Sequence, residues 1–95
     1  MKVTVEFLSL PLVTQALGKK KIDVEFNGST LSDLSGELSG KVKKFKEVIM
    51  GRNGSIDNDI QVYINGKDRI NREDIDSRTI NNGDTVTFML LVAGG

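Results

Sequence analysis

The residues best placed for chemistry are two glycines, Gly94 and Gly95, which close the sequence directly after Val92 and Ala93. A carboxylate is a poor electrophile until its oxygen becomes a good leaving group, as in a mixed anhydride with AMP. Glycine has no side chain and accepts backbone angles closed to other residues, so this slender end can enter a narrow channel toward ATP held by another enzyme. We therefore expect the carboxylate of Gly95 to be the reacting group.

Once adenylated, Gly95 can be attacked by sulfur from a persulfide or sulfide donor, which gives a carboxyl-terminal thiocarboxylate able to deliver sulfur. The chain has no cysteine, so this terminus is the only plausible place for it to carry sulfur. A Gly-Gly terminus alone is a weak signal, because it can simply end a chain. Its weight depends on the fold that precedes it.

The absence of histidine and cysteine narrows the possible functions. It excludes disulfides, thiolate nucleophiles, the usual zinc sites and imidazole acid–base catalysis. Lysines and carboxylates are present, but they form no pattern typical of an active site, and the acidic stretch 57–59 lacks the remainder of a calcium-binding loop. We predict a protein that is not an enzyme by itself and that holds no metal or cofactor.

The composition is that of a small globular domain, with 95 residues of which 38% are hydrophobic and 27% charged. Thirteen basic residues balance thirteen acidic ones, so nothing draws the chain toward nucleic acid or anionic lipid. No apolar run approaches the roughly 20 residues of a membrane span, and the first residues lack the pattern of a signal peptide. We expect a cytoplasmic protein that binds neither nucleic acid nor membrane.

Apolar residues alternate in four segments, 2–8, 21–26, 60–64 and 85–92, and each pattern predicts a strand with one buried face. Asn65-Gly66 favours a tight hairpin turn and a short return strand. The last strand is the most apolar, so it should be central. The expected inward residues are Val3, Val5, Phe7, Ile22, Val24, Phe26, Ile60, Val62, Ile64, Val86, Phe88, Leu90 and Val92.

A helix is predicted from Thr30, a good N-cap, to about Gly40, with leucines at helical spacing and Asp33 completing a capping box. A second helical piece is expected within 41–50. For residues 9–20, which contain the only proline, we expect an extended connection. Its Leu12 and Leu17 would pack against the domain.

This order of elements predicts an α+β domain in which a mixed five-stranded sheet carries a helix across one face. The β-grasp, or ubiquitin-like, fold has this order. One domain is expected to span residues 1–92, and residues 93–95 to form a flexible Ala-Gly-Gly tail. A Gly-Gly end that follows the central strand of such a fold without a gap is a stronger signal than Gly-Gly alone.

Alternation along the last strand turns Met89 and Leu91 away from the helix, and Tyr63 lies on the same outer face. Apolar residues clustered on an open sheet face favour a partner surface. We expect these three residues to form the partner interface, together with Val92 at the end of the domain and Ala93 at the start of the tail. Scattered surface hydrophobic residues, which are common, are the alternative.

The sequence resembles the ThiS/MoaD sulfur-carrier family over nearly its whole length, and most closely the archaeal-type MoaD-like or ubiquitin-like small modifier proteins. The resemblance rests on "GKKKIDVEF", "GSTLSDLSGEL", "VYING", "INNGDTVTFM" and "VAGG". Asn82 stands where the family usually has aspartate. Met89, Leu90 and Leu91 precede the tail where many members have proline, a difference that bears on the choice of partner.

The resemblance implies that Gly95 is adenylated and thiocarboxylated, with Gly94 as its required neighbour. The activating partner would be an E1-like adenylyltransferase of the MoeB/ThiF type, which uses ATP. In the MoaD branch, favoured by chain length and the second helical piece, the carrier docks onto the MoaE-type large subunit of molybdopterin synthase. In the ThiS branch it supplies sulfur to thiazole synthase.

Two further possibilities stay open. Some relatives are joined to protein lysines in a ubiquitin-like way, and a plain interaction domain would leave the tail idle.

Overall fold

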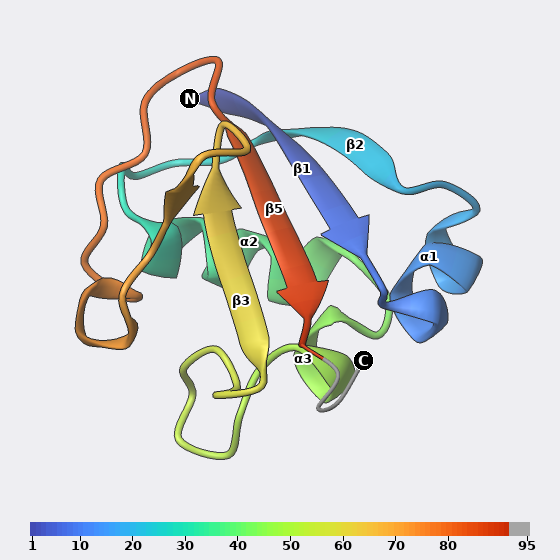
Figure 1. The fold of residues 1–95 in the computed structure, drawn as a ribbon. Helices are drawn as coiled ribbons and strands as arrows, with labels where there is room; N and C mark the ends of the chain where they lie inside the picture. Colours follow the sequence, from blue (N-terminus) through green and yellow to red (C-terminus); the bar gives the residue numbers. More distant parts are fainter. Residues whose placement is uncertain (92–95) are drawn as a thin grey trace.

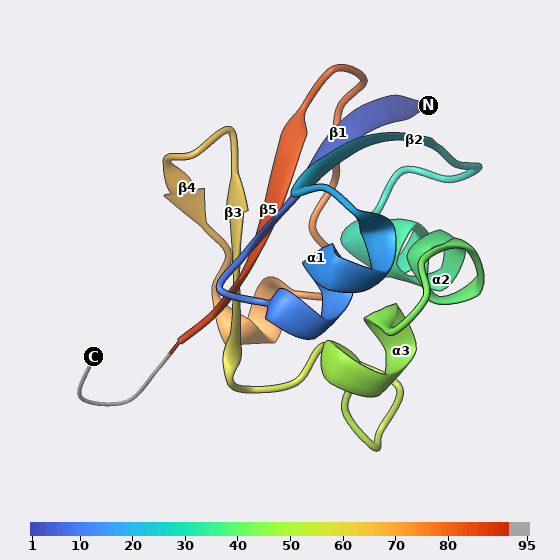
Figure 2. The ribbon, with the colours of Figure 1, turned by 90° about the vertical axis from the view of Figure 1, so that its right-hand side faces the viewer.

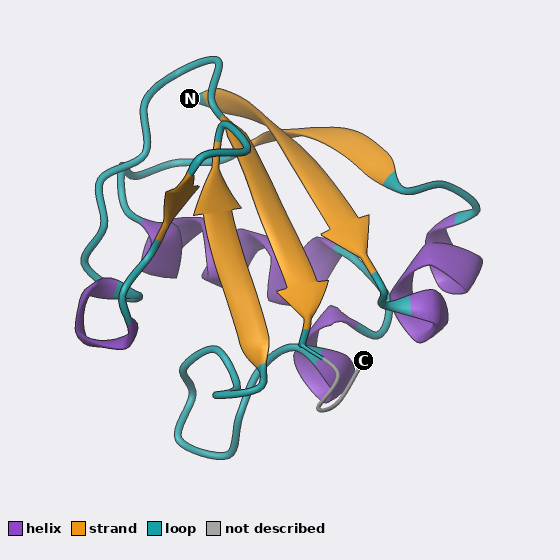
Figure 3. Ribbon diagram, in the orientation of Figure 1, coloured by secondary structure: helices purple, strands orange, loops and turns teal. Residues whose placement is uncertain are grey.

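The computed structural model describes residues 1–91, and residues 92–95 lie outside that description. Apart from the additional helix at Pro11–Leu17, the strands and helices follow nearly the predicted order (Figures 1 and 3). In chain order the elements are β1 (Lys2–Leu8), α1 (Pro11–Leu17), β2 (Lys21–Glu25), α2 (Leu31–Lys41), α3 (Phe45–Val48), β3 (Ile60–Ile64), β4 (Asp68–Arg69), the short 3-10 helix η1 (Arg72–Asp74) and β5 (Thr85–Leu90).

The five strands form one mixed sheet in the order β2-β1-β5-β3-β4. The apolar β5 lies at the centre, parallel to β1 and antiparallel to β3, with Val86 opposite Val5 and Phe88 opposite Val62. The pairs β1–β2 and β3–β4 are antiparallel. The predicted α+β arrangement, with a mixed five-stranded sheet and a central last strand, is therefore confirmed.

All three α-helices lie on the same face of this sheet. Figure 2 shows the sheet nearly edge-on, with α1, α2 and α3 to one side. The long helix α2 buries Leu31, Leu34 and Leu38, the leucines whose spacing predicted it. No helix within residues 1–91 covers the opposite face, which we call the outer face.

Alternation along the strands places most of the expected side chains in the core between the sheet and the helices. Every second residue of β3 is buried, and so is every second residue of β1 from Val3 to Phe7. At the centre, the ring of Phe88 lies 5.3 Å from that of Phe45, edge to face, and 5.8 Å from that of Phe7. These three rings join β1, α3 and β5.

The start of α2 is fixed by the predicted capping box. The Thr30 hydroxyl accepts from the Asp33 N–H at 3.2 Å, and the Asp33 carboxylate accepts from the N–H groups of Ser29 and Thr30. These bonds, chiefly the one from Ser29, lower the pKa of the Asp33 carboxyl below its ordinary value. Gly28 precedes them with φ +115°, and a Cβ there would lie 2.3 Å from an Asp33 carboxylate oxygen.

The prediction for residues 9–20 was wrong, because this segment contains a helix instead of an extended connection. Pro11 occupies the first turn of α1, where its missing N–H costs nothing. Gly18 ends the helix in the left-handed conformation, with φ +79°. Val13 is fully buried, while Leu12, expected to pack inward, is 60% exposed; Leu17 is partly buried against the core.

The turn after β3 follows the sequence more closely. Asn65 and Gly66 both have positive φ, at 54° and 73°, as the predicted tight hairpin requires. The second helical piece is shorter than expected. It covers only Phe45–Val48, because Lys44 adopts a left-handed conformation that interrupts the helix.

Within residues 1–91, no helix combines the length and apolar character needed to cross a membrane.

Candidate functional site

The outer face of the sheet carries a continuous row of side chains across all five strands. The register places Lys21, Glu6, Thr87, Tyr63 and Arg69 side by side, in that order from β2 to β4. Residues directly opposite in a sheet point to the same side. The row therefore runs from one sheet edge to the other, with an aromatic ring near its middle.

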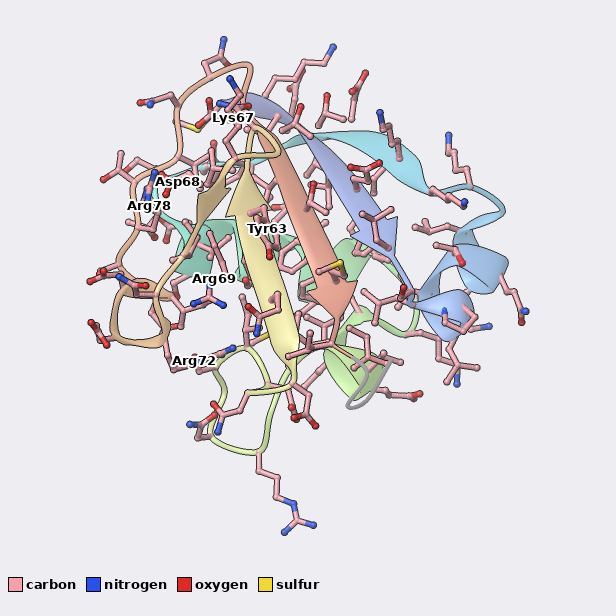
Figure 4. All side chains as sticks on the ribbon, viewed as in Figure 1. Tyr63, Lys67, Asp68, Arg69, Arg72 and Arg78 are labelled. Carbon is pink, nitrogen blue, oxygen red and sulfur yellow. The ribbon has the colours of Figure 1, made fainter. Side chains whose placement is uncertain are left out.

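A shallow cavity of about 230 Å³ opens on this face over β1, β5 and β3. We call it the outer-face groove. Its lining is mostly apolar, and Figure 4, which looks onto the outer face, shows Tyr63 projecting over the strands there. The residues that line it are Glu6, Leu8, Tyr63, Gly66, Thr87 and Met89.

Two polar side chains of the groove, Thr87 and Glu6, are paired with each other. The Thr87 hydroxyl donates to a Glu6 carboxylate oxygen at 3.1 Å, and Thr87 is only 5% exposed although it lies on the outer face. Glu6 also lies 3.9 Å from the exposed ammonium of Lys21, a contact worth little in water. A partner that covers the groove would therefore meet apolar side chains and an already satisfied hydrogen bond.

The structure brings together two of the three predicted outer-face residues. Tyr63 and Met89 both line the groove, and both are half-buried. Leu91 does not line it; this side chain is 60% exposed, directly beyond the end of β5. The other predicted interface residues, Val92 and Ala93, lie outside the described residues, as do Gly94 and Gly95.

Sequence reasoning missed Glu6, Leu8 and Thr87. Alternation along β1 gave part of the signal, because it turns Glu6 and Leu8 outward when Phe7 points inward. The missing information was the register between β1 and β5, which sets Glu6 opposite Thr87 and Leu8 opposite Met89. That register joins residues about 80 positions apart in the chain, as the 81-residue separation of Glu6 and Thr87 shows.

The chain leaves the sheet at Leu91, which is held by a backbone hydrogen bond. Leu91 donates its backbone N–H to the carbonyl of Asp59 at 3.0 Å, which extends the β3–β5 contact one residue beyond Leu90. Asp59 belongs to the loop that enters β3, and this loop also surrounds a polar cavity of about 470 Å³. The last described residue is thus tied to the loop before β3.

No group of three or more acidic residues in the described part of the chain is arranged to hold a metal ion. The pKa of the Asp33 carboxyl, which belongs to the helix cap, is lowered below its ordinary value. Its displacement is explained by the capping bonds and needs no functional role.

Comparison with solved structures identifies the fold. The chain matches SAMP1 from Haloferax volcanii over 100% of both chains, with 19% identity and a TM-score of 0.79. It matches a chain of the Amycolatopsis orientalis BexX/CysO complex over 98% of this chain and 99% of that one, with 24% identity and a TM-score of 0.71.

A Pyrococcus furiosus protein described as subunit 1 of a molybdopterin converting factor matches over 97% of this chain and 99% of its own, with 24% identity and a TM-score of 0.70. No family model and no curated protein matches the sequence. The matches confirm, at the level of the fold, the resemblance to ThiS/MoaD-type ubiquitin-like β-grasp proteins.

Proposed function

We propose that this chain, which has the ubiquitin-like β-grasp fold, is a sulfur carrier whose reactive group is the carboxylate of Gly95. One observation carries the proposal: the sequence Gly94-Gly95 follows within a few residues of the central strand β5. The fold supplies a rigid body, and the two glycines add a segment thin enough to reach another protein's active site. The chain is a co-substrate in this scheme and supplies no catalytic group of its own.

The chemistry divides into two steps on a partner enzyme. The Gly95 carboxylate attacks the α-phosphorus of ATP, and pyrophosphate leaves, which makes an acyl-adenylate. Sulfide then attacks the acyl carbon, the bond to the AMP oxygen breaks, and a thiocarboxylate forms with release of AMP and a proton. An E1-like adenylyltransferase of the MoeB/ThiF type fits this role. We infer that the reaction takes place in the cytoplasm, where ATP is available.

We further propose that the sulfur goes to molybdopterin, with the chain acting as the small subunit beside a MoaE-type large subunit of molybdopterin synthase. The support is the Pyrococcus furiosus neighbour, which is described as a subunit of a molybdopterin converting factor. Transfer of sulfur to a thiazole synthase is the alternative within the same chemistry. Assays with each purified acceptor, supplied with the thiocarboxylated chain, distinguish the two.

The outer-face groove, with Tyr63 and Met89, is the surface that we propose for docking onto the activating enzyme. Leu91 lies beyond it at the beginning of the reactive segment, with its side chain exposed. A partner seated on the groove would therefore contact the body and the base of the terminal segment at once.

Intact-mass measurement tests the proposal directly. Incubation with the E1-like adenylyltransferase of the source organism, ATP and sulfide should raise the mass of the chain by the replacement of one oxygen by sulfur. Deletion of Gly95, or its conversion to an amide, should abolish this gain. If the truncated chain still acquires sulfur, Gly95 is not the site.

Conjugation to proteins is a second candidate function, favoured by the match to two structures of SAMP1, the small archaeal modifier protein 1 of Haloferax volcanii. The same adenylate would then be passed to a lysine amine in place of sulfide. This function predicts a Gly-Gly remnant on target lysines after proteolysis and conjugates that survive reducing agent.

A further inference from the structure

Arg72 forms an unusually dense set of contacts with the loop before β3. Its guanidinium donates to the carbonyls of Ile56 at 3.1 Å, Asp57 at 3.3 Å, Asn58 at 3.2 Å and Ile60 at 2.7 Å. Figure 4 shows Arg72 reaching from η1 toward this loop. One side chain therefore binds four of the five carbonyls in the segment 56–60.

The fifth carbonyl of the segment, that of Asp59, is the acceptor for Leu91. All five carbonyls thus have partners, and the one that Arg72 leaves free is used by the first residue after β5. Ile56 and Ile60 anchor the two ends of the segment in the core, with exposed fractions of 4% and 1%. Between them the segment is built from Asp57, Asn58 and Asp59, whose side chains are not in the core.

Such a segment needs a partner that can hold several carbonyls at fixed angles. A guanidinium has five N–H donors in a rigid plane, whereas a lysine ammonium is a point charge with three donors on a flexible stem. Arg72 is therefore suited to holding the segment 56–60 in one conformation, and lysine at the same position is not.

We propose that Arg72 is a positioning residue that fixes where the reactive carboxyl-terminal segment leaves the body. By holding the segment 56–60, it keeps the Asp59 carbonyl in place to receive the Leu91 N–H, and so sets the direction of the chain four residues before Gly95. This inference rests on the proposed function, because it gives Arg72 a role in presenting Gly95 to the activating enzyme.

The first test compares Arg72→Lys with Arg69→Lys, a matched control on β4. Both changes keep the positive charge, and within residues 1–91 the Arg69 guanidinium donates a single long bond, to Gln61 at 3.4 Å. Amide hydrogen exchange is followed by NMR at Leu91 and at the core residue Phe88. In Arg72→Lys, exchange at Leu91 should accelerate on the order of tenfold relative to Phe88, as expected for one net hydrogen bond. Arg69→Lys should leave the ratio unchanged.

The second test measures activation of the same variants by the E1-like adenylyltransferase, through ATP–pyrophosphate exchange. A segment that is no longer held must be ordered when it binds, so Arg72→Lys should raise KM several-fold, roughly threefold to tenfold, with kcat little changed. Arg69→Lys should behave like the unmodified chain. A loss of equal size in both variants would show that the effect follows from replacing either arginine and not from the contacts of Arg72 with the segment 56–60, and would overturn the proposal.

Other outcomes are equally decisive. Equal acceleration at Leu91 and Phe88 in Arg72→Lys would show general destabilisation, and unchanged exchange at Leu91 would show that Arg72 does not hold it; either result overturns the proposal. Faster exchange at Leu91 with an unchanged KM would show that Arg72 holds Leu91 but has no role in presenting Gly95 to the activating enzyme. If the unmodified chain is not activated at all, the proposed function fails, while the exchange experiment still decides whether Arg72 fixes Leu91.

Discussion

The stability of the domain should depend on pH through one residue, Asp33. Its carboxylate accepts two backbone N–H groups at the start of α2, and these bonds lower its pKa in the folded state. A carboxyl whose folded pKa lies below its unfolded pKa stabilises the fold above the unfolded value. That contribution is lost as the pH falls through the folded pKa.

Comparison of the unmodified chain with Asp33→Asn should reveal this dependence. The variant should be less stable at neutral pH, and the difference in urea midpoint should shrink as the pH is lowered below about 4, where the unfolded carboxyl takes up its proton. Urea unfolding at a series of pH values measures it. A difference that stayed constant from neutral to strongly acid pH would mean that the carboxylate charge plays no part in the cap.

Gly28 and Gly36 provide a matched pair of glycine substitutions. Alanine at Gly28 would adopt φ +115° and meet the Asp33 carboxylate at 2.3 Å, so Gly28→Ala should destabilise the fold by about 1–3 kcal/mol. Gly36 lies inside α2 with open space around its missing Cβ, so Gly36→Ala should stabilise it by about 0.5–1 kcal/mol. Thermal unfolding of both variants checks the two signs. Destabilisation by Gly36→Ala would contradict the open space around this position of α2.

At the scale of the strand, successive side chains of β5 have different roles. Those that point toward the helices stabilise the fold, and those that point to the outer face are available to a partner. Phe88 is fully buried against two other rings, whereas Met89, its neighbour, lines the outer-face groove. Met89→Asp should therefore keep the fold and weaken binding to the activating enzyme by roughly tenfold or more, as for a central interface residue. Phe88→Ala should instead cost about 3–5 kcal/mol of stability.

Calorimetric titration measures the binding of these variants to the activating enzyme, and thermal unfolding measures their stability. Leu91→Asp gives a further comparison at the edge of the proposed surface, because this residue is exposed but does not line the groove. Unfolding of Met89→Asp would place Met89 in the core and remove the groove from the proposed interface.

The elements that the sequence predicted correctly are those whose signals are local. Alternation identified the strands, and the Thr30–Asp33 spacing identified the helix start with its reciprocal bonds. The helix α1 was missed although a local signal existed: proline is well suited to the first turn of a helix, where Pro11 lies. The groove and the Arg72 contacts depend on residues brought together from distant parts of the chain, and no local pattern reports such pairings.

At the scale of the whole molecule, the proposed function divides labour between a body that binds and a terminal segment that reacts. The helices cover one sheet face (Figure 2), the groove lies on the other (Figure 4), and Leu91 follows directly after β5, two positions beyond Met89 of the groove lining. Gly95, the proposed reactive residue, lies outside the described residues, four positions further along the chain. Binding and reaction should then be separable by mutation.

A chain without Gly95 tests this separation, because it should still occupy the activating enzyme while offering no correct terminus. We expect it to inhibit pyrophosphate exchange by the intact chain competitively, with an inhibition constant close to the dissociation constant of the intact chain. The same truncation combined with Met89→Asp should inhibit roughly tenfold more weakly or worse, since the groove supplies the affinity. If the singly truncated chain does not compete, the glycines themselves provide most of the binding energy, and the body's outer face is not the docking surface.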